Sequence, residues 1–255
     1  MTFMVARSQK EIDILRQGGK KLARILNLLK KSVRPGLKTI ELELLAEFEM
    51  KKEGVESSFK GYRSGKEPPY PAVVCVSIND EIVHGIPGNR VIKEGDVVSL
   101  DLGIKYGGLF TDLAVSVVAG KGSEESILLV SVCEGALDAG IAECRTGAHL
   151  GDIGHAVQSF VEKKEFKVFK ELVGHGVGLS VHEDPQIPNW GEPGTGMKLR
   201  EGMVLAIEPM ITKGRISIKL DSDGWTWKTR DGFPAAHFEH TVLVRKGSSE
   251  ILTAI

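Results

Sequence analysis

Apolar residues along the first fifty positions predict two helices. Between residues 8 and 33 they recur every three to four positions, which is the period of a helix with one buried face. The sequence Arg-Pro-Gly at 34–36 ends this helix, because proline and glycine both interrupt helical structure. A second helix is predicted over about residues 40–52, with Thr39 as its N-cap and Glu41 in its first turn.

Strands and a second pair of helices are predicted further along the chain. Residues 96–104 and 109–118 are rich in β-branched and apolar side chains, and the sequence KYGG between them is typical of a hairpin turn. Another helix is then predicted from Ser123 to about Glu143, and one more over about residues 151–164, before further strands. The chain therefore follows one plan twice, with two helices and then strands each time.

Short sequence matches in the same order support this repeat. We predict a single domain, 1–255, of the α/β (α+β) class, whose pseudo-repeat halves at about 8–120 and 121–255 each combine two helices with antiparallel strands. The matches pair Arg34, Gly36 and Glu41 with Arg145, Gly147 and Asp152, the VHxxP segment 83–87 with 181–185, segment 94–101 with 201–208, and segment 112–117 with 239–244.

Composition narrows the class of protein. With 42% hydrophobic and 26% charged residues the chain is typical of globular domains, and its net charge of −1 gives no reason to expect nucleic-acid binding. Three cysteines without CxxC spacing disfavour both a disulfide framework and a cysteine-based zinc site, which suits a reducing cytoplasm. No apolar run reaches the roughly 18 residues of a membrane span, so we expect a cytoplasmic protein without membrane contact.

Two aspartates on the predicted hairpin are the first candidate site residues. If the turn lies at 106–107, Asp101 faces Asp112 directly across the two strands; a turn two residues along makes the pair diagonal but leaves both on one face. Cross-strand neighbours have Cβ atoms about 4.5 to 5.5 Å apart, and like charges there repel each other. Such a pair requires a shared proton or a cation.

The repeat extends this pair to four carboxylates. Glu208 and Glu239 occupy the positions of the second half that match Asp101 and Asp112. Two divalent cations would neutralise four such carboxylates, and oxygen ligands with one imidazole, for which we choose His175, suit Mn, Fe, Co or Zn. Two ions about 3.5 to 4 Å apart can activate a bridging water and polarise a carbonyl, which describes amide hydrolysis.

His175 and His182 lie seven residues apart in a glycine-rich segment. Glycines at 174, 176 and 178 each cost a helix about 1 kcal/mol relative to alanine, so the two rings are not expected on one helical face. In an extended chain an odd separation points them to opposite faces, so we predict that they do not converge and have different roles. For the other histidines an ordinary structural role is expected, with His240 a candidate support for its neighbour Glu239; they are His149, His155, His237 and His240.

Five sequence stretches together resemble one family. These are VCVSINDEIVHGIP, DLGIKYGGLFTD, GHGVGLSVHEDP, LAIEPM and HFEHT, and with them nearly the whole chain resembles the methionine aminopeptidases of the short bacterial type. The resemblance implies the pseudo-twofold pita-bread fold around a central curved sheet, and removal of N-terminal methionine from new polypeptides by two-metal hydrolysis. It also implies peptide substrates, possible ribosome association and a monomer.

The resemblance implies a role for each site residue. Asp101, and His175 with Glu208, would be end ligands of the two metals, and Asp112 and Glu239 would bridge them. Glu208 would also shuttle the proton between a metal-bridging hydroxide and the leaving amine. His182 would contact the scissile carbonyl and its tetrahedral intermediate, and His84 would hold the substrate backbone. The methionine pocket would involve Tyr62, Tyr70, Cys75 and Trp225, although an ordinary core position for Cys75 stays open.

The chain departs from the family pattern at two places. Seven residues, 63–69, separate Tyr62 from Tyr70 where relatives have fewer, and Val181 stands where a phenylalanine is frequent, which predicts a roomier pocket. Two other functions are considered. A non-catalytic pita-bread module would bind peptides but typically lacks the ligands, and a proline-directed aminopeptidase typically has an added N-terminal domain.

Overall fold

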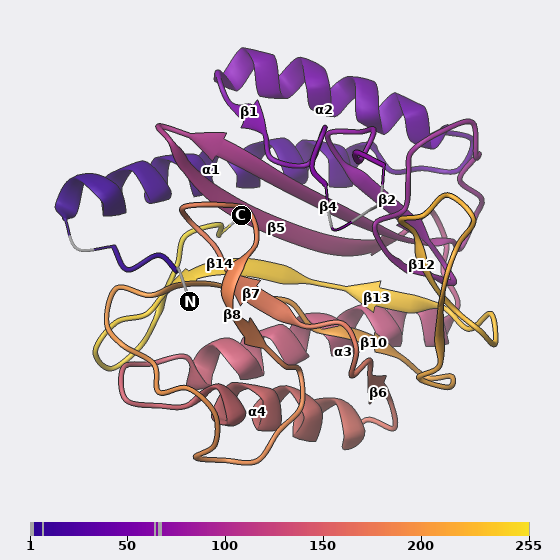
Figure 1. Cartoon of the computed structure of the whole chain (residues 1–255). Coiled ribbons are helices and arrows are strands. Elements are labelled where there is room, and N and C mark those ends of the chain that lie inside the picture. The colour runs from indigo at the N-terminus through magenta and orange to yellow at the C-terminus, as the bar shows by residue number, and fades with distance from the viewer. Residues whose placement is uncertain (1–2, 7, 64, 66–67, 255) are drawn as a thin grey trace.

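Two long helices in the first half cover one side of the protein. The computed structural model describes residues 3–6, 8–63, 65 and 68–254. Helix α1 (Gln9–Ser32) begins at Ser8, which caps it together with Glu11, and it buries an apolar face, as its periodicity predicts. Helix α2 (Thr39–Glu53) follows. With α1 it covers the first half of the sheet, while α3 (Glu124–Glu143) and α4 (Leu150–Glu162) cover the second half (Figure 1). Residues of all four helices share one apolar core with Leu113 and Ile207, which lie on the same face of the strands.

The predicted N-cap of α2 is wrong by one residue. The cap is Lys38, and Thr39 is the first helical residue. The Thr39 hydroxyl is engaged elsewhere, because it exchanges hydrogen bonds with the backbone of Gly88 at 2.8 and 3.0 Å. The side chain of Glu41 caps the helix instead, by accepting a hydrogen bond from Lys38 N at 2.8 Å.

The helices pack against an antiparallel sheet. Among the described residues it has nine strands, in the order β1-β4-β5-β14-β9-β7-β8, with β2 paired to β4 and β15 to β14. Because β5 pairs with β14, the two halves of the chain meet at the middle of this sheet. The nine strands are β1 (Glu56–Ser57), β2 (Cys75–Ile78), β4 (Val97–Tyr106), β5 (Leu109–Val118), β7 (Gly174–Gly176), β8 (Glu183–Ile187), β9 (Val204–Ile207), β14 (Glu239–Leu243) and β15 (Glu250–Ile251).

Two small sheets complete the described part of the chain. Strands of two or three residues form them, in the orders β13-β10-β6 and β11-β12-β3. The first lies near α3. The second connects the two halves again, because β3 belongs to the first half of the chain and β12 to the second. Their strands are β3 (Glu81–Val83), β6 (Lys167–Val168), β10 (Met210–Thr212), β11 (Ile218–Leu220), β12 (Trp227–Thr229) and β13 (Ala235–His237).

The β4–β5 hairpin turns one residue later than the first of the two predicted registers. Its turn residues are Gly107 and Gly108, with φ of 57° and 88°, so Asp101 lies opposite Ala114 and Asp112 lies opposite Gly103. A two-residue hairpin turn of this hand needs positive φ at both positions, which two glycines adopt readily and a tyrosine does not. The direct pairing of Asp101 with Asp112 is therefore wrong, and the diagonal arrangement on one face is found.

Candidate active site

Four carboxylates from the two halves meet at the centre of the main sheet. Asp101 lies on β4 and Asp112 on β5, while Glu208 directly follows β9 and Glu239 begins β14. Each residue is less than a tenth exposed. Oxygens of Asp101, Asp112 and Glu239 lie within 4.8 Å of one another, and Glu239 forms a second such group with Glu208 and His175.

The electrostatics of this cluster fit bound cations. Burial raises the pKa of Asp101, Glu208 and Glu239 well above their ordinary values, and neighbouring carboxylates raise them further. Burial likewise raises the pKa of Asp112 to about 7. Oδ1 of Asp101 and Oε1 of Glu239 are buried without a hydrogen-bond partner among the described residues. Divalent cations would satisfy these oxygens and offset the repulsion, so the donor set suits them.

The His175 ring is held with one nitrogen facing the acids. It lies on β7, and its Nδ1 is 2.9 Å from the carbonyl oxygen of Gly176, to which Nδ1–H donates. Nε2 then has the free lone pair, and it lies 3.4 Å from Oε1 of Glu208 and 3.9 Å from Oε1 of Glu239. Burial lowers the pKa of His175 well below its ordinary value, so the ring is neutral, as a metal ligand must be.

The predicted divergence of His175 and His182 is wrong. Their ring centroids are 4.5 Å apart in an edge-to-face contact, and Asp112 has an oxygen within 4.8 Å of a nitrogen of each. The chain reverses between β7 and β8, with Gly178 at φ 134°, so the alternation of one straight strand does not apply. His182 therefore lies beside the acidic cluster, and its side chain is exposed at the cavity.

His84 reaches the same place from β3 in an unusual backbone conformation. Its φ is 61°, which is uncommon for a residue with a side chain and is maintained only by surrounding contacts. Thr226 approaches the His84 carbonyl oxygen at 3.3 Å, and Ser77 accepts a hydrogen bond from Gly85 N at 3.0 Å. Burial lowers the pKa of His84 to about 4, so this ring too is neutral at pH 7.

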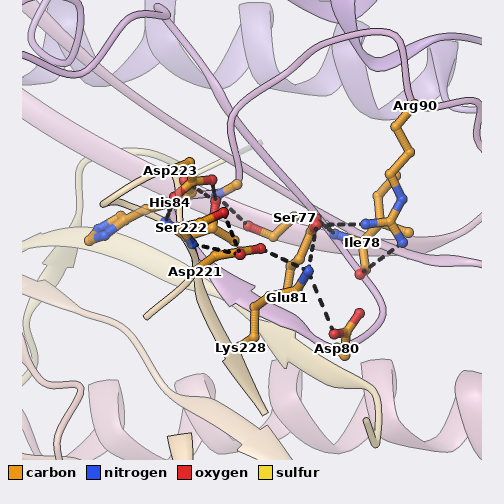
Figure 2. A network of polar contacts seen from close by, with 12 residues as sticks. Ser77, Ile78, Asp80, Glu81, His84, Arg90, Asp221, Ser222, Asp223 and Lys228 are labelled. Carbon is orange, nitrogen blue, oxygen red and sulfur yellow. Dashed lines mark hydrogen bonds and ion pairs between the residues drawn. The ribbon is translucent and has the colours of Figure 1, made fainter. Parts of the chain in front are cut away.

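Charged residues hold the segment that carries His84 against the β11–β12 hairpin. Figure 2 shows Glu81 between the basic side chains of Arg90, at 2.6 Å, and Lys228, at 3.7 Å. Lys228 also pairs with Asp221 at 3.1 Å and Asp80 at 3.8 Å, and the three acids thus share one ammonium group. Lys228 lies on β12, in the second half of the chain, and Glu81 lies on β3, in the first half. These ion pairs therefore connect the two halves of the chain next to the segment that carries His84.

The acidic cluster lies in a cavity of about 990 Å³ with an aromatic wall. The predicted pocket residues Tyr62, Tyr70, Cys75 and Trp225 all line it. Tyr70 OH donates to Gly85 O at 3.0 Å, and Trp225 Nε1 donates to Pro68 O at 2.9 Å, so polar contacts fix both rings. Cys75 pairs with Asp101 across β2 and β4, which places its thiol between the aromatic wall and the acids.

Val181, like Phe59, belongs to the apolar cluster of this wall. Val181 is 3% exposed and packs in the same cluster as Tyr70 and Trp225. Phe59 lines the cavity and makes an edge-to-face contact with Tyr70, at 6.4 Å between ring centroids. Sequence reasoning did not select Phe59, because a single phenylalanine before an irregular segment has no distinguishing pattern. Part of the segment 63–69 lies outside the described residues.

Among the histidines that were expected to be structural, His237 is different. It is 1% exposed, and its Nε2 lies 3.3 Å from Oε2 of Glu208. A signal was present in the sequence, since alternation along a strand places residues 237 and 239 on one face. The same alternation points His240 away from Glu239, and its Nδ1 instead lies 2.9 Å from Thr253 Oγ1, so the suggested support of Glu239 by His240 is wrong.

The remaining two histidines have local contacts at helix α4. His149 is its N-cap residue and lies 3.7 Å from Asp152, while His155 lies 3.3 Å from Ser159 one turn later. Within the described residues, no helix is both long and apolar enough to cross a membrane.

Comparison with known proteins assigns the family. The sequence pattern of Metallopeptidase family M24 matches residues 13–246. The chain is 43% identical over 253 residues to Methionine aminopeptidase 1 of Bacillus subtilis, with 99% of this chain and 100% of the relative covered. It is 44% identical over 257 residues to the methionine aminopeptidase of Aquifex aeolicus, with 97% and 98% covered.

Solved structures agree with this assignment. The methionine aminopeptidase of Thermotoga maritima matches with a TM-score of 0.94 at 43% identity, over 99% of this chain and 100% of that chain. A prolidase from Pyrococcus furiosus matches with a TM-score of 0.76 at 21% identity, over 99% of this chain and 66% of that chain, which shows a shared fold alone. The predicted pita-bread fold is confirmed. The chain belongs to the metallopeptidase family M24 and, within it, to the methionine aminopeptidases.

Proposed function

We propose that the protein removes the N-terminal methionine from polypeptides by metal-dependent hydrolysis of the first peptide bond. One observation carries this proposal: four buried carboxylates and a neutral imidazole converge at the base of a cavity whose wall is aromatic. The acids supply a binding place for cations, and the wall is of suitable chemistry for a thioether side chain. Family membership supports metal use and aminopeptidase activity.

The proposed ligands are Asp101, Asp112, His175, Glu208 and Glu239, and they would hold two divalent ions, Co, Mn, Fe or Zn. Glu239 has oxygens in both groups of converging ligand atoms, and this shared membership supports its role as a bridge. Asp112 is likewise close both to Asp101 and to His175. Bound ions would lower the pKa of a water molecule and polarise the scissile carbonyl.

The protein's own groups would handle the proton and the developing charge. Glu208 accepts a proton from the attacking water and donates it to the leaving amine. His182 stands beside His175 at the cavity surface and donates its N–H to the carbonyl oxygen as negative charge develops there. His84, which contacts the Trp225 ring at 6.2 Å between centroids, hydrogen-bonds the substrate backbone.

The pocket would select the methionine side chain. Tyr62 and Tyr70 contact Trp225 at 6.4 and 5.4 Å between ring centroids, so the three rings form a continuous wall. The Cys75 thiol adds a soft, polarisable atom next to them. The free N-terminal amine of the substrate would complete the coordination of one bound ion, and only the first residue of a peptide has such an amine, which explains an exopeptidase.

The experiment is release of methionine from Met-Gly-Met by purified protein with Mn, Co, Fe or Zn added singly. We expect activity with at least one metal, and a loss of about 100-fold to 10,000-fold in kcat for Glu208→Ala, because a general base and ligand is removed. Glu201→Ala is the matched control, since Glu201 is exposed. Intact peptide with every metal would contradict the proposal and favour a peptide-binding module.

The substrates under this function are peptides with an N-terminal methionine. Ribosome association, a monomeric state and a cytoplasmic location stay predictions that come from the family resemblance.

A further inference from the structure

One buried histidine at the acidic cluster has no part in the mechanism so far. His237 lies on β13, is 1% exposed, and has neither ring nitrogen in a hydrogen bond to a described residue. An unpaired polar group in the interior lowers the stability of the folded state by on the order of 1–3 kcal/mol. An apolar side chain would fill the same space without this loss. The position therefore calls for a polar partner.

Glu208 is the polar group that its ring faces. Nε2 of His237 lies 3.3 Å from Oε2 of Glu208, while the other oxygen, Oε1, lies 3.4 Å from Nε2 of His175. The carboxylate thus stands between two imidazoles, with one oxygen toward each. Oε1 is the oxygen that faces His175, whose Nε2 also lies 3.9 Å from Oε1 of Glu239.

Two buried serines fix the backbone of His237. The Ser116 hydroxyl accepts a hydrogen bond from His237 N at 2.9 Å and donates one to His237 O at 2.9 Å. Ser99 Oγ lies 2.7 Å from Ser116 Oγ. Because the Ser116 proton goes to His237 O, the Ser99 hydroxyl is the donor between the two serines. Ser99 shares a strand with Asp101, and Ser116 shares one with Asp112, so the strands that carry these two acids also place His237.

The chemistry of the ring allows it to donate. An imidazole, neutral or protonated, can present an N–H at Nε2, the nitrogen that faces Oε2 of Glu208. An ionised carboxylate is a strong acceptor for such a donor. Ligating carboxylates commonly have a hydrogen bond to their second oxygen, and loss of such a partner typically costs about 10-fold to 100-fold in metal affinity or activity.

We propose that His237 is a positioning residue, which donates Nε2–H to Oε2 of Glu208 and so holds Oε1 toward His175 and the cation side. It acts on the reaction through Glu208 and does not touch the substrate. The inference rests on the proposed function, because it gives Glu208 the role described there.

The test compares an apolar and a polar replacement. His237→Phe removes the donor and keeps a planar ring, whereas His237→Gln keeps an N–H donor; His237→Leu is the second apolar variant if the phenylalanine lowers the melting temperature. Calorimetric titration with Mn²⁺ alone gives metal affinity, and kinetics with Met-Gly-Met give kcat and KM separately. His155→Phe, on the exposed side of α4, is the matched control.

We expect the apolar variants to bind Mn²⁺ about 10-fold to 100-fold more weakly, with a lower kcat and a KM within twofold, and the glutamine variant to regain most of the loss. Wild-type affinity and kcat in an apolar variant that is folded would overturn the proposal, as would a glutamine variant as impaired as the apolar ones. If the wild-type protein releases no methionine, the proposed function fails, yet the Mn²⁺ titrations still decide the role of His237.

Discussion

At the scale of single residues, Gly103 leaves room for one acid of the cluster. It lies opposite Asp112 in the β4–β5 ladder. A Cβ at this position would be 2.7 Å from Phe59 Cε1 and 3.2 Å from Asp112 Oδ1, and would overlap Ser58 Oγ. The absence of a side chain therefore leaves the space in which Asp112 turns toward Asp101 and Glu239.

Gly103→Ala is expected to destabilise the protein by about 1–3 kcal/mol, because a tightly packed site must move to admit the methyl group. Displacement of Asp112 should also weaken Mn²⁺ binding. Urea unfolding and calorimetric titration measure the two effects. Gly88→Ala is the control, since a Cβ there would meet nothing within 4 Å. Equal stability and Mn²⁺ affinity in the two variants would show that Gly103 does not shape the cluster.

The site residues differ in how far sequence could predict them. The four carboxylates were predictable because the repeat assigns matching positions to the two halves, and a cluster of like charges implies a cation. His237 was not, because its importance comes from a 3.3 Å contact to Glu208, and nothing in local sequence shows which strand lies beside it. Residue type and spacing point to candidate ligands, whereas the side chains that contact these candidates depend on tertiary packing.

At the scale of elements, the turn between β11 and β12 carries the Trp225 wall of the pocket. Asp223 organises this turn: its Oδ1 accepts hydrogen bonds from Trp225 N and Thr226 N, both at 2.8 Å, and its Oδ2 accepts one from Thr226 Oγ1 at 2.6 Å. Thr226 in turn approaches the His84 carbonyl oxygen at 3.3 Å. One aspartate thus steadies both the pocket wall and the segment that carries His84.

Asp223→Ala should raise KM for methionyl peptides about fivefold, which corresponds to ~1 kcal/mol of substrate binding, since the turn loses its side-chain acceptor. Mn²⁺ affinity should not change, because none of the proposed metal ligands lies on the turn. Steady-state kinetics and calorimetric titration check both statements. Ser222→Ala, at the exposed neighbouring position, controls for a change in the turn surface. An unaltered KM would mean that Trp225 keeps its place without Asp223.

The elements themselves were predictable where their pattern is long. The helices were found to within two residues, apart from the N-cap of α2, because each has several turns of consistent periodicity. The strands of the two small sheets have only two or three residues, too few for a period to be recognised. The reversal that brings His182 to His175 was missed for the same reason, since β7 has three residues and Gly178 permits the turn.

At the scale of the whole molecule, the acidic cluster makes folding depend on cations and on protons. The unfolded chain has carboxyl pKa values near 4, while in the folded metal-free protein burial raises the pKa of Asp112 to about 7 and those of the other three acids well upward. The folded state therefore binds more protons than the unfolded state at neutral pH. Its stability must fall as pH rises, and cations must compete with these protons for the same oxygens.

The melting temperature of metal-free protein should therefore decrease from pH 7 to pH 8.5. The buried histidines have the opposite effect on stability, but only below about pH 6.5, where histidines of the unfolded chain become protonated. Between pH 7 and pH 8.5 the change in stability therefore comes from the acids. Each acid that is still protonated lowers the free energy of unfolding by up to ~1.4 kcal/mol per pH unit. The melting temperature of a protein of this size falls by roughly 2–4 °C for each kcal/mol.

Stabilisation by added Mn²⁺ should be larger at pH 8.5 than at pH 7. Thermal unfolding with EDTA or with Mn²⁺ measures both slopes, and Asp112→Asn, which cannot ionise, should flatten the metal-free slope. A metal-free melting temperature that is constant or rises over this interval would mean that the four acids do not share a buried site.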